Sequence, residues 1–380
     1  MHLIFFAIIQ SYNWWVIRGL PENYEGFGKA YIHSISKNDI QSVSWNPANY
    51  YLNPKNGTSL ELFSVQTNFV NEQLLGKTGY NYYIDDEAKD KFFASIKGDY
   101  YTYKNISEKT VISVAYKNYA FTYKSRVYWD LKTPKDFYTL LLIGGPFPDT
   151  NYNLDGGKGT AQIVDEYGLN ISLPPIKGIF SGVRLKYLQG KSCSALDSSN
   201  GLIETTWDSI INTSEFFFSS AEGGNGFGID FGIAGKWKKF YTGLCIENLY
   251  SIINWTDSTL HEDQLDTTLI YEVPSFKSHL PVSLRMASSY DLGVTRFIFA
   301  TSFEKYWAFS VAASSELWKH ILATGGFVYS FSSISPIIQI GFSPTKKIKL
   351  MIGYHTEEGP GPLVPNFKSS AYSFSSSITF

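Results

Sequence analysis

The 380-residue chain contains no run of the roughly 18 to 20 apolar residues that a membrane-spanning helix requires. If the chain crosses a membrane, it must cross as β-strands, because every backbone group in lipid needs a hydrogen-bond partner within the protein. The chain also has only two cysteines, Cys193 and Cys245. Two cysteines are too few for a disulfide framework or a cysteine-rich metal site. They can form one bridge at most, and we expect instead two unpaired small residues in or beside strands.

Strong charge of either sign is missing as well. The net charge is −2, and no run of five or more like charges occurs, which argues against nucleic acid as a partner. No His-Glu-x-x-His, Gly-x-Ser-x-Gly or Walker-type segment is found. Residues 223–228 are glycine-rich, but they open a strand and not a helix, which favours a turn over a phosphate-binding loop. We predict no enzymatic activity, no metal and no cofactor.

What the sequence does contain is a two-residue period. At the C-terminus, large apolar side chains alternate with small polar ones: Tyr372, Phe374, Ile378 and Phe380 against Ser373, Ser375, Ser377 and Thr379. The same alternation runs through residues 227–234, 282–287 and 348–354. A helix does not produce this pairing of large with small residues, whereas a strand between lipid and a wet interior does.

Aromatic residues form 17% of the chain, with 27 Tyr, 28 Phe and 9 Trp. Membrane barrels place such rings in girdles at both interfaces. We therefore predict an all-β fold, a transmembrane antiparallel β-barrel. At about 22 residues per strand and connection it has about 14 strands, with 12 or 16 as alternatives. The competing interpretation is a soluble all-β protein with an aromatic core.

Three segments are predicted along the chain. Residues 1–17 are interpreted as a signal segment, although positive leading residues are missing and a first strand or buried segment is the alternative. Residues 18–57 are rich in Gly, Pro and Asn. A barrel of this size encloses more space than its own side chains can fill, so it is either water-filled or plugged, and this segment is the candidate plug. Residues 58–380 form the barrel, with a long external loop expected at 144–168.

Two short motifs in the predicted plug resemble a known family. They are Gly26-Phe27-Gly28-Lys29-Ala30-Tyr31 and, about a dozen residues later, Ser44-Trp45-Asn46-Pro47-Ala48. Together they resemble the N-terminal hatch of the FadL-type outer-membrane long-chain fatty acid transporters and their PorV/PorQ-like relatives. Independently of the family, the Asn-Pro pair favours a fixed turn, and the glycines allow close approach or positive φ.

The resemblance implies a location in the outer membrane of a diderm bacterium and a hatch that blocks the lumen. Gating is then assigned to Gly26, Gly28, Ala30, Trp45, Asn46, Pro47 and Ala48. A hydrophobic small molecule would bind between hatch and wall and pass without an energy source. The aromatic Phe380 resembles the terminal residue that the outer-membrane assembly machinery reads.

Residues 226–232, 244–248 and 280–285 are more similar to the PorV-like branch. That similarity implies the alternative function, an accessory of type IX protein secretion that binds exported proteins and transports no nutrient. A general polar porin is a weaker third interpretation, because no ring of lumenal charges is evident. Besides these partners, the fold implies contact with membrane lipids.

Several charged residues fall on the small, polar faces of their predicted strands, which face the lumen of a membrane barrel. They are Arg184, Lys186, Asp230, Glu247 and Arg285. Of the cations, Arg184, Lys186 and Arg285 are candidates for receiving a ligand carboxylate, since arginine binds carboxylates in a bidentate manner. The alternative role is ion pairing between wall and plug.

Overall fold

The computed structural model describes residues 46–48, 59–70, 90, 93–94, 96, 98–116, 118–140, 147–213, 215–264, 267–273, 275–303, 307–330, 333–345, 348–359 and 367–379. The predicted signal segment lies outside the described residues. So do Gly26, Gly28, Ala30, Trp45 and Phe380. Of the hatch motifs, only Asn46, Pro47 and Ala48 are described. Among the described residues, no helix is long and apolar enough to cross a membrane.

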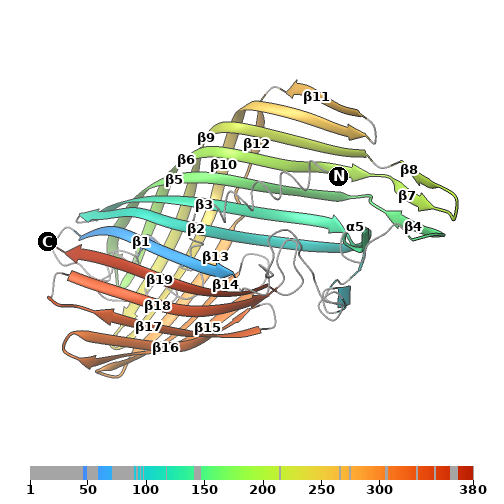
Figure 1. Cartoon of the computed structure of the whole chain (residues 1–380). Coiled ribbons are helices and arrows are strands. Elements are labelled where there is room, and N and C mark those ends of the chain that lie inside the picture. The colour runs from blue at the N-terminus through green and yellow to red at the C-terminus, as the bar shows by residue number, and fades with distance from the viewer. Residues whose placement is uncertain are drawn as a thin grey trace.

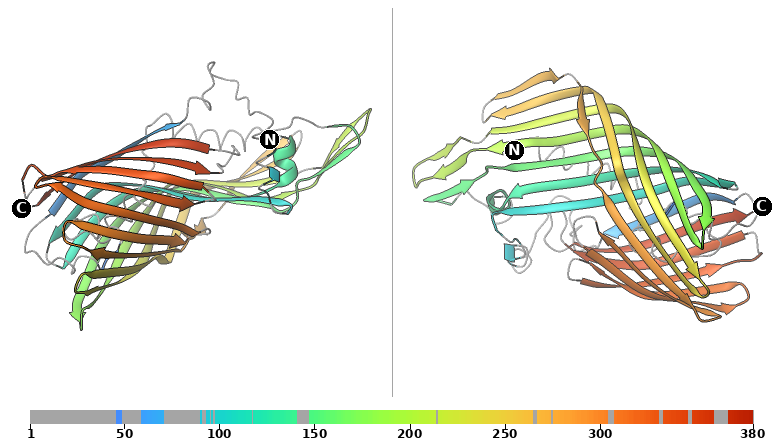
Figure 2. Two further views of the ribbon diagram at one scale, coloured as in Figure 1. Left: turned by 90° about the horizontal axis from the view of Figure 1, so that it is seen from below. Right: turned by 180° about the vertical axis from the view of Figure 1, so that it is seen from behind.

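The described strands form one large antiparallel sheet that closes on itself (Figures 1 and 2). The ring contains β1 (Ser59–Val70), β2 (Tyr100–Tyr116), β3 (Tyr119–Pro134), β5 (Gly157–Ile176), β6 (Ile179–Asn200), β9 (Glu215–Trp237), β10 (Phe240–Gln264), β13 (Ser283–Asp291), β14 (Thr295–Phe303), β15 (Trp307–Trp318), β16 (Ile321–Ser330), β17 (Ser333–Phe342), β18 (Ile348–Gly359) and β19 (Phe367–Thr379). The sheet has 16 strands, and without β11 (Thr267–Val273) and β12 (Phe276–Ser278), which pair only with β10, fourteen form the ring. The predicted fold class, an antiparallel β-barrel, is confirmed.

Short turns join the strands at one end of the ring, where the described C-terminal strand also ends (Figure 1). Between β5 and β6 the turn consists of Lys177 and Gly178, with φ of 50° and 82°. Positive φ at both central residues is typical of a type I′ turn, which suits the right-handed twist of the paired strands. We call this the turn end of the barrel, and the opposite one the arm end.

At the arm end a small three-stranded sheet continues beyond the ring. It consists of β4 (Thr150–Asn153), β7 (Leu202–Thr205) and β8 (Ile210–Asn212), next to the single-turn helix α5 (Lys135–Tyr138). The expected loop at residues 144–168 is therefore wrong, because β4 and most of β5 lie there. The glycines suggested a loop, but they serve packing: a Cβ on Gly159 would lie 2.5 Å from Leu131 Cδ2, and one on Gly168 would lie 2.7 Å from Thr122 Oγ1.

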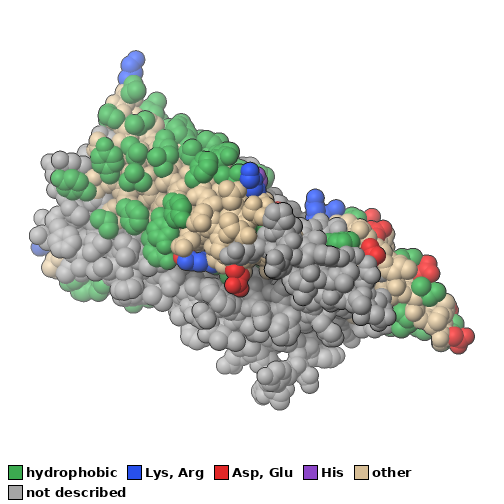
Figure 3. All heavy atoms as spheres, turned by 90° about the horizontal axis from the view of Figure 1, so that it is seen from above, with side chains coloured by type: hydrophobic (Ala, Val, Ile, Leu, Met, Phe, Trp, Pro, Cys, Tyr) green, Lys and Arg blue, Asp and Glu red, His purple; other side chains and the backbone are tan. Residues whose placement is uncertain are grey.

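Large apolar side chains cover the outer face of the ring (Figure 3). The buried side chains include many polar and charged residues and also an apolar cluster around Leu188, Ile253 and Trp255. On β6, Leu185 and Tyr187 are exposed, while Arg184 and Lys186 between them are buried. This is the arrangement of a membrane barrel, because lipid needs an apolar surface and the lumen does not. Cys193 on β6 and Cys245 on β10 are both buried in strands and form no disulfide bond.

A row of aromatic side chains lies along the border of the apolar band that is nearer the arm end. The row crosses four strands in register through Tyr123, Tyr167, Tyr187 and Phe227. The hydroxyls bond to polar residues one step nearer the arm end: Tyr123 Oη donates to Asp165 Oδ2 at 3.2 Å, and Tyr187 Oη to Asn225 Oδ1 at 2.5 Å. Tyrosine has an apolar ring and a polar hydroxyl, and it is therefore typical of the interface between membrane and water. We call this row the upper girdle.

The two sides of the wall differ in height. Strands β5, β6, β9 and β10 have 20 to 25 residues, whereas β13, β14, β16 and β17 have 9 or 10. Pairing is also uneven. Strand β1 pairs with β19 along its full length, but with β2 only from Ser59 to Glu61. The long strands carry the site described next.

Candidate functional site

The Asn-Pro-Ala tripeptide of the predicted hatch is bound to the inner face of the tall wall. Asn46 is fully buried, and its Nδ2 donates to the carbonyl oxygens of Ile233 and Leu244, both at 3.1 Å. These two residues are register partners on β9 and β10. The Ala48 amide donates to Asn46 Oδ1 at 2.9 Å. One side chain therefore shapes the turn and also attaches it to two strands.

The wall is notched where the tripeptide lies. Ser172, Gly182 and Gly232 follow one another in register on β5, β6 and β9. Ser172 Oγ donates to the Pro47 carbonyl oxygen at 2.6 Å. A Cβ on Gly182 would lie 2.4 Å from that oxygen, and one on Gly232 would lie 2.0 Å from Asn46 Oδ1. The two glycines are thus needed for close approach of the tripeptide. We call these three wall residues the seat.

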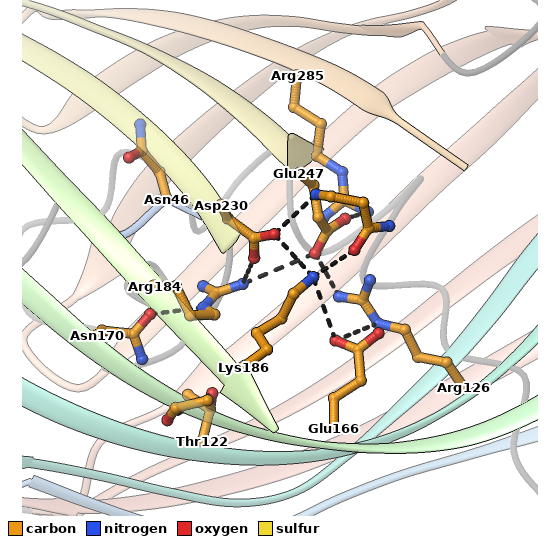
Figure 4. A network of polar contacts seen from close by, with 12 residues as sticks. Asn46, Thr122, Arg126, Glu166, Asn170, Arg184, Lys186, Asp230, Glu247 and Arg285 are labelled. Carbon is orange, nitrogen blue, oxygen red and sulfur yellow. Dashed lines mark hydrogen bonds and ion pairs between the residues drawn. The ribbon is translucent and has the colours of Figure 1, made fainter. Parts of the chain in front are cut away.

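A layer of buried charged side chains begins two residues from the seat toward the arm end, where Arg184 on β6 lies opposite Asp230 on β9. Figure 4 shows this layer. Asp230, which is 0% exposed, lies at its centre. Its carboxylate accepts from Arg184 Nη1 at 3.0 Å, from Lys186 Nζ at 2.7 Å and from the Asn248 amide at 2.7 Å. Arg184 Nε also donates to Asn170 Oδ1 at 2.6 Å. These contacts link β5, β6, β9 and β10 across the inner face of the wall.

Two further carboxylates extend the layer. Glu247 pairs with Arg126 and, at 2.8 Å, with Arg285 Nη2. Glu166 accepts from the Tyr128 hydroxyl and lies 3.6 Å from Arg126 Nε. A carboxylate buried with arginines on both sides is stable only because each charge has partners within hydrogen-bond reach. We call Lys124, Arg126, Glu166, Arg184, Lys186, Asp230, Glu247 and Arg285 the ionic layer.

A bulge in β10 brings Glu247 and its neighbour into the lumen together. The register between β10 and β9 shifts between Ile246 and Tyr250, and Asn248 has φ of 53°. Asparagine tolerates this conformation better than most residues. Both Glu247 and Asn248 are consequently buried, and Asn248 Nδ2 donates to the Pro281 carbonyl oxygen at 2.8 Å. Lys186 Nζ bonds to Asn248 Oδ1 as well.

The described layer holds five cations and three carboxylates, each at most 5% exposed. The structure brings the predicted residues Arg184, Lys186 and Arg285 together in it. Each of the three forms an ion pair with a carboxylate on a neighbouring strand of the wall. Contact with a ligand carboxylate stays a prediction. No group of three or more His, Cys, Asp or Glu suited to a metal occurs in the described part of the chain.

Sequence reasoning missed Lys124, Arg126, Glu166 and the seat. The cations at 124 and 126 alternate with Tyr123, Ser125 and Val127 on β3, which was a usable signal for a lumenal face. Glu166 fell within the segment interpreted as a loop. The seat left no signal, because a glycine in a strand does not reveal which segment approaches it.

Comparison with known proteins identifies the fold. The toluene transporter TbuX of Ralstonia pickettii shares 10% sequence identity, with a TM-score of 0.54 over 95% of this chain and 98% of that one. The chain has the fold of the FadL-type outer-membrane transporters. A Pseudomonas aeruginosa FadL homologue matches at 11% identity and a TM-score of 0.49, over 94% and 98% of the chains. The Pseudomonas putida toluene transporter TodX matches at 8% and 0.47, over 95% and 98%.

Comparison of sequences matches less of the chain than comparison of structures does. A family model described as a family of unknown function (DUF5723) matches residues 58–215. No curated protein sequence matches the chain. The segment of the family match contains β1 to β6 and therefore Arg126, Glu166, Arg184 and the first two residues of the seat.

Proposed function

We propose that the protein lies in the outer membrane and admits hydrophobic small molecules, such as long-chain fatty acids, by passive passage gated at the Asn-Pro-Ala tripeptide. The observation that carries this proposal is the seat. A tripeptide held by one serine hydroxyl and two backbone carbonyls, in a notch of two glycines, can leave without breaking a covalent bond or a strand pair. Passage then needs only a ligand that binds the unseated state more tightly.

The ionic layer gives the second part of the proposal, a preference for ligands with an anionic head group. It has two more cations than carboxylates among the described residues, and it lies next to the seat on the side of the arm end. Arginine and lysine in a dry site attract a carboxylate strongly. We assign this role to Arg184, Lys186 and Arg285, and no catalytic role to any residue. The fold was found in transporters, and TbuX carries toluene, which supports a hydrophobic cargo.

Replacing Asn46 tests the gate. Asn46→Ala removes two bonds to the wall and the bond that shapes the turn, which costs about 1 to 3 kcal/mol for the seated state. We expect proteoliposomes that contain the variant to swell at least threefold faster in a solution of a small sugar. We also expect faster uptake of labelled oleate by cells that express the variant and lack a fatty acid transporter of their own. Asn151→Ala, an exposed residue of β4, is the matched control and leaves both rates unchanged.

Two results contradict the proposal. If folded Asn46→Ala protein swells liposomes no faster than wild type, the tripeptide is not the gate. If cells with wild-type protein take up oleate and toluene no faster than cells without it, transport is not the function, and the secretion-accessory alternative gains support. Folding of each variant is checked by heat-modifiable migration, that is, by comparing unheated and heated samples on a gel.

A further inference from the structure

The small sheet at the arm end projects beyond the apolar band of the barrel. On β6, Asn200 follows Tyr187 of the upper girdle by 13 residues, which corresponds to about 43 Å of extended strand. The sheet of β4, β7 and β8 begins where that strand ends and points away from the turn end (Figures 1 and 2). We call residues 147–157 and 200–213 the arm. Their side chains lie outside the region that lipid covers.

The base of the arm is packed as a small core. Tyr152, Leu154 and Ile203 form a buried cluster with Phe137 and Tyr138 of α5. Burial raises the pKa of the Tyr138 hydroxyl above its ordinary value. Phe147 and Tyr152 are joined as well, since the Phe147 amide donates to Tyr152 Oη at 3.0 Å. A base of this kind presents the free end of the arm as a fixed surface.

The free end exposes large apolar side chains. Trp207 is 79% exposed, Ile210 61%, Ile211 50% and Phe147 47%. The turn that carries Trp207 is ordered, because the Thr206 amide donates to the Ser209 carbonyl oxygen at 2.8 Å and the Ser209 amide donates to Thr206 Oγ1 at 3.0 Å. Exposed clusters that include tryptophan mark interaction surfaces, where tryptophan contributes much of the binding energy.

The charge of the arm has one sign. It contains Asp149, Asp155, Glu204 and Asp208, and neither Lys nor Arg. Figure 3 shows carboxylates and apolar side chains together toward the free end. A membrane surface rich in phosphate has the same sign and is therefore repelled. A second copy of the chain that used the same patch would bring these carboxylates together, which is also unfavourable.

We propose that the end of the arm is a docking surface for a protein outside the membrane, through a segment in which Lys or Arg side chains flank apolar ones. Trp207 and Ile210 supply the apolar contact. Asp149 and Asp208 receive the basic side chains and align the segment. The proposal concerns a surface remote from the lumen, so it stands independently of the gate at Asn46.

Binding of a designed peptide tests this surface. The probe is a labelled peptide in which Lys alternates with Leu, compared with one in which Glu replaces Lys. The full chain is held in nanodiscs of phosphatidylcholine, and fluorescence anisotropy gives the dissociation constants. We expect the Lys peptide to bind at least tenfold more tightly than the Glu peptide, and its binding to weaken as salt rises, because screening shortens the reach of exposed charges.

Variants locate the binding on the arm. Trp207→Ser with Ile210→Thr, and separately Asp149→Asn with Asp208→Asn, should each weaken the Lys peptide at least tenfold. Asn151→Ser on the same arm should not change it. Equal binding of both peptides, equal binding to empty nanodiscs, or unchanged binding to the Trp207→Ser, Ile210→Thr variant overturns the proposal. Dimerisation of wild-type protein that this variant abolishes also overturns it, in favour of a second copy as occupant.

Discussion

The tall and the short halves of the barrel wall differ in the chemistry of their inner faces. The tall half, from β5 to β10, holds the seat, the bulge at Asn248 and most of the ionic layer. The short half, from β13 to β17, contributes only Arg285 to the ionic layer, and its buried residues include small hydroxyls, among them Ser289, Thr301 and Ser310. Of these, Ser289 Oγ and Thr301 Oγ1 are buried without a hydrogen-bond partner among the described residues.

The difference shows that a strand that only completes the barrel needs other inward side chains than a strand that forms the seat and the ionic layer. Small residues suffice where the wall only completes the sheet. The tall half instead needs charges in neighbouring register rows, such as Arg184 opposite Asp230, because a buried charge is stable only beside its counter-charge. Three pairs of substitutions test this contrast, each with one member in either half.

Removing a carboxylate should have the largest effect. Asp230→Asn leaves Arg184 and Lys186 buried with one counter-charge fewer, which should lower the free energy of unfolding by about 3 to 5 kcal/mol. In the short half, Asp291→Asn breaks a partly exposed pair with Arg296 and should cost at most about 1 kcal/mol. Urea unfolding of the protein in lipid vesicles measures both. Equal losses would show that the ionic layer is not more tightly coupled than a surface pair.

Adding one methyl group should come next. Gly232→Ala puts a Cβ 2.0 Å from Asn46 Oδ1, so the tripeptide must move away from the wall. We expect faster liposome swelling, as for Asn46→Ala, and a loss of about 1 to 3 kcal/mol. Gly325→Ala on β16 is the counterpart in the short half, where no atom lies within 4 Å of the added Cβ. Swelling of the Gly232→Ala protein at the rate of Gly325→Ala would contradict the tight fit of the seat.

Removing one hydroxyl should have the smallest effect. Ser172→Ala loses the bond to the Pro47 carbonyl oxygen, about 1 kcal/mol. Ser289→Ala in the short half removes a hydroxyl that has no hydrogen-bond partner among the described residues, and it should change stability by less than about 0.5 kcal/mol. The same urea experiment compares them. A larger loss at Ser289 than at Ser172 would mean that the contrast between the halves is not one of polar contacts.

The alternation in residues 227–234 and 282–287 was sufficient to predict a barrel, because a two-residue period with one apolar face is typical of strands that separate an apolar side from a wet one. The same pattern placed Arg184, Lys186 and Asp230 in the lumen. Their ion-pair partners could not be predicted from the sequence. Arg126 and Glu247 are 121 residues apart, and only the register of strands far apart in sequence brings them together. The seat was invisible for the same reason.

The pairing of β1 has a consequence for how the protein is made. β1 is the first described strand, and its long partner is β19, the last one, whereas it meets β2 over only three residue pairs. Contacts that span almost the whole polypeptide are slow to form, since the loop between them must close first. The ring of described strands therefore cannot close until β1 and β19, which are about 300 residues apart, have met.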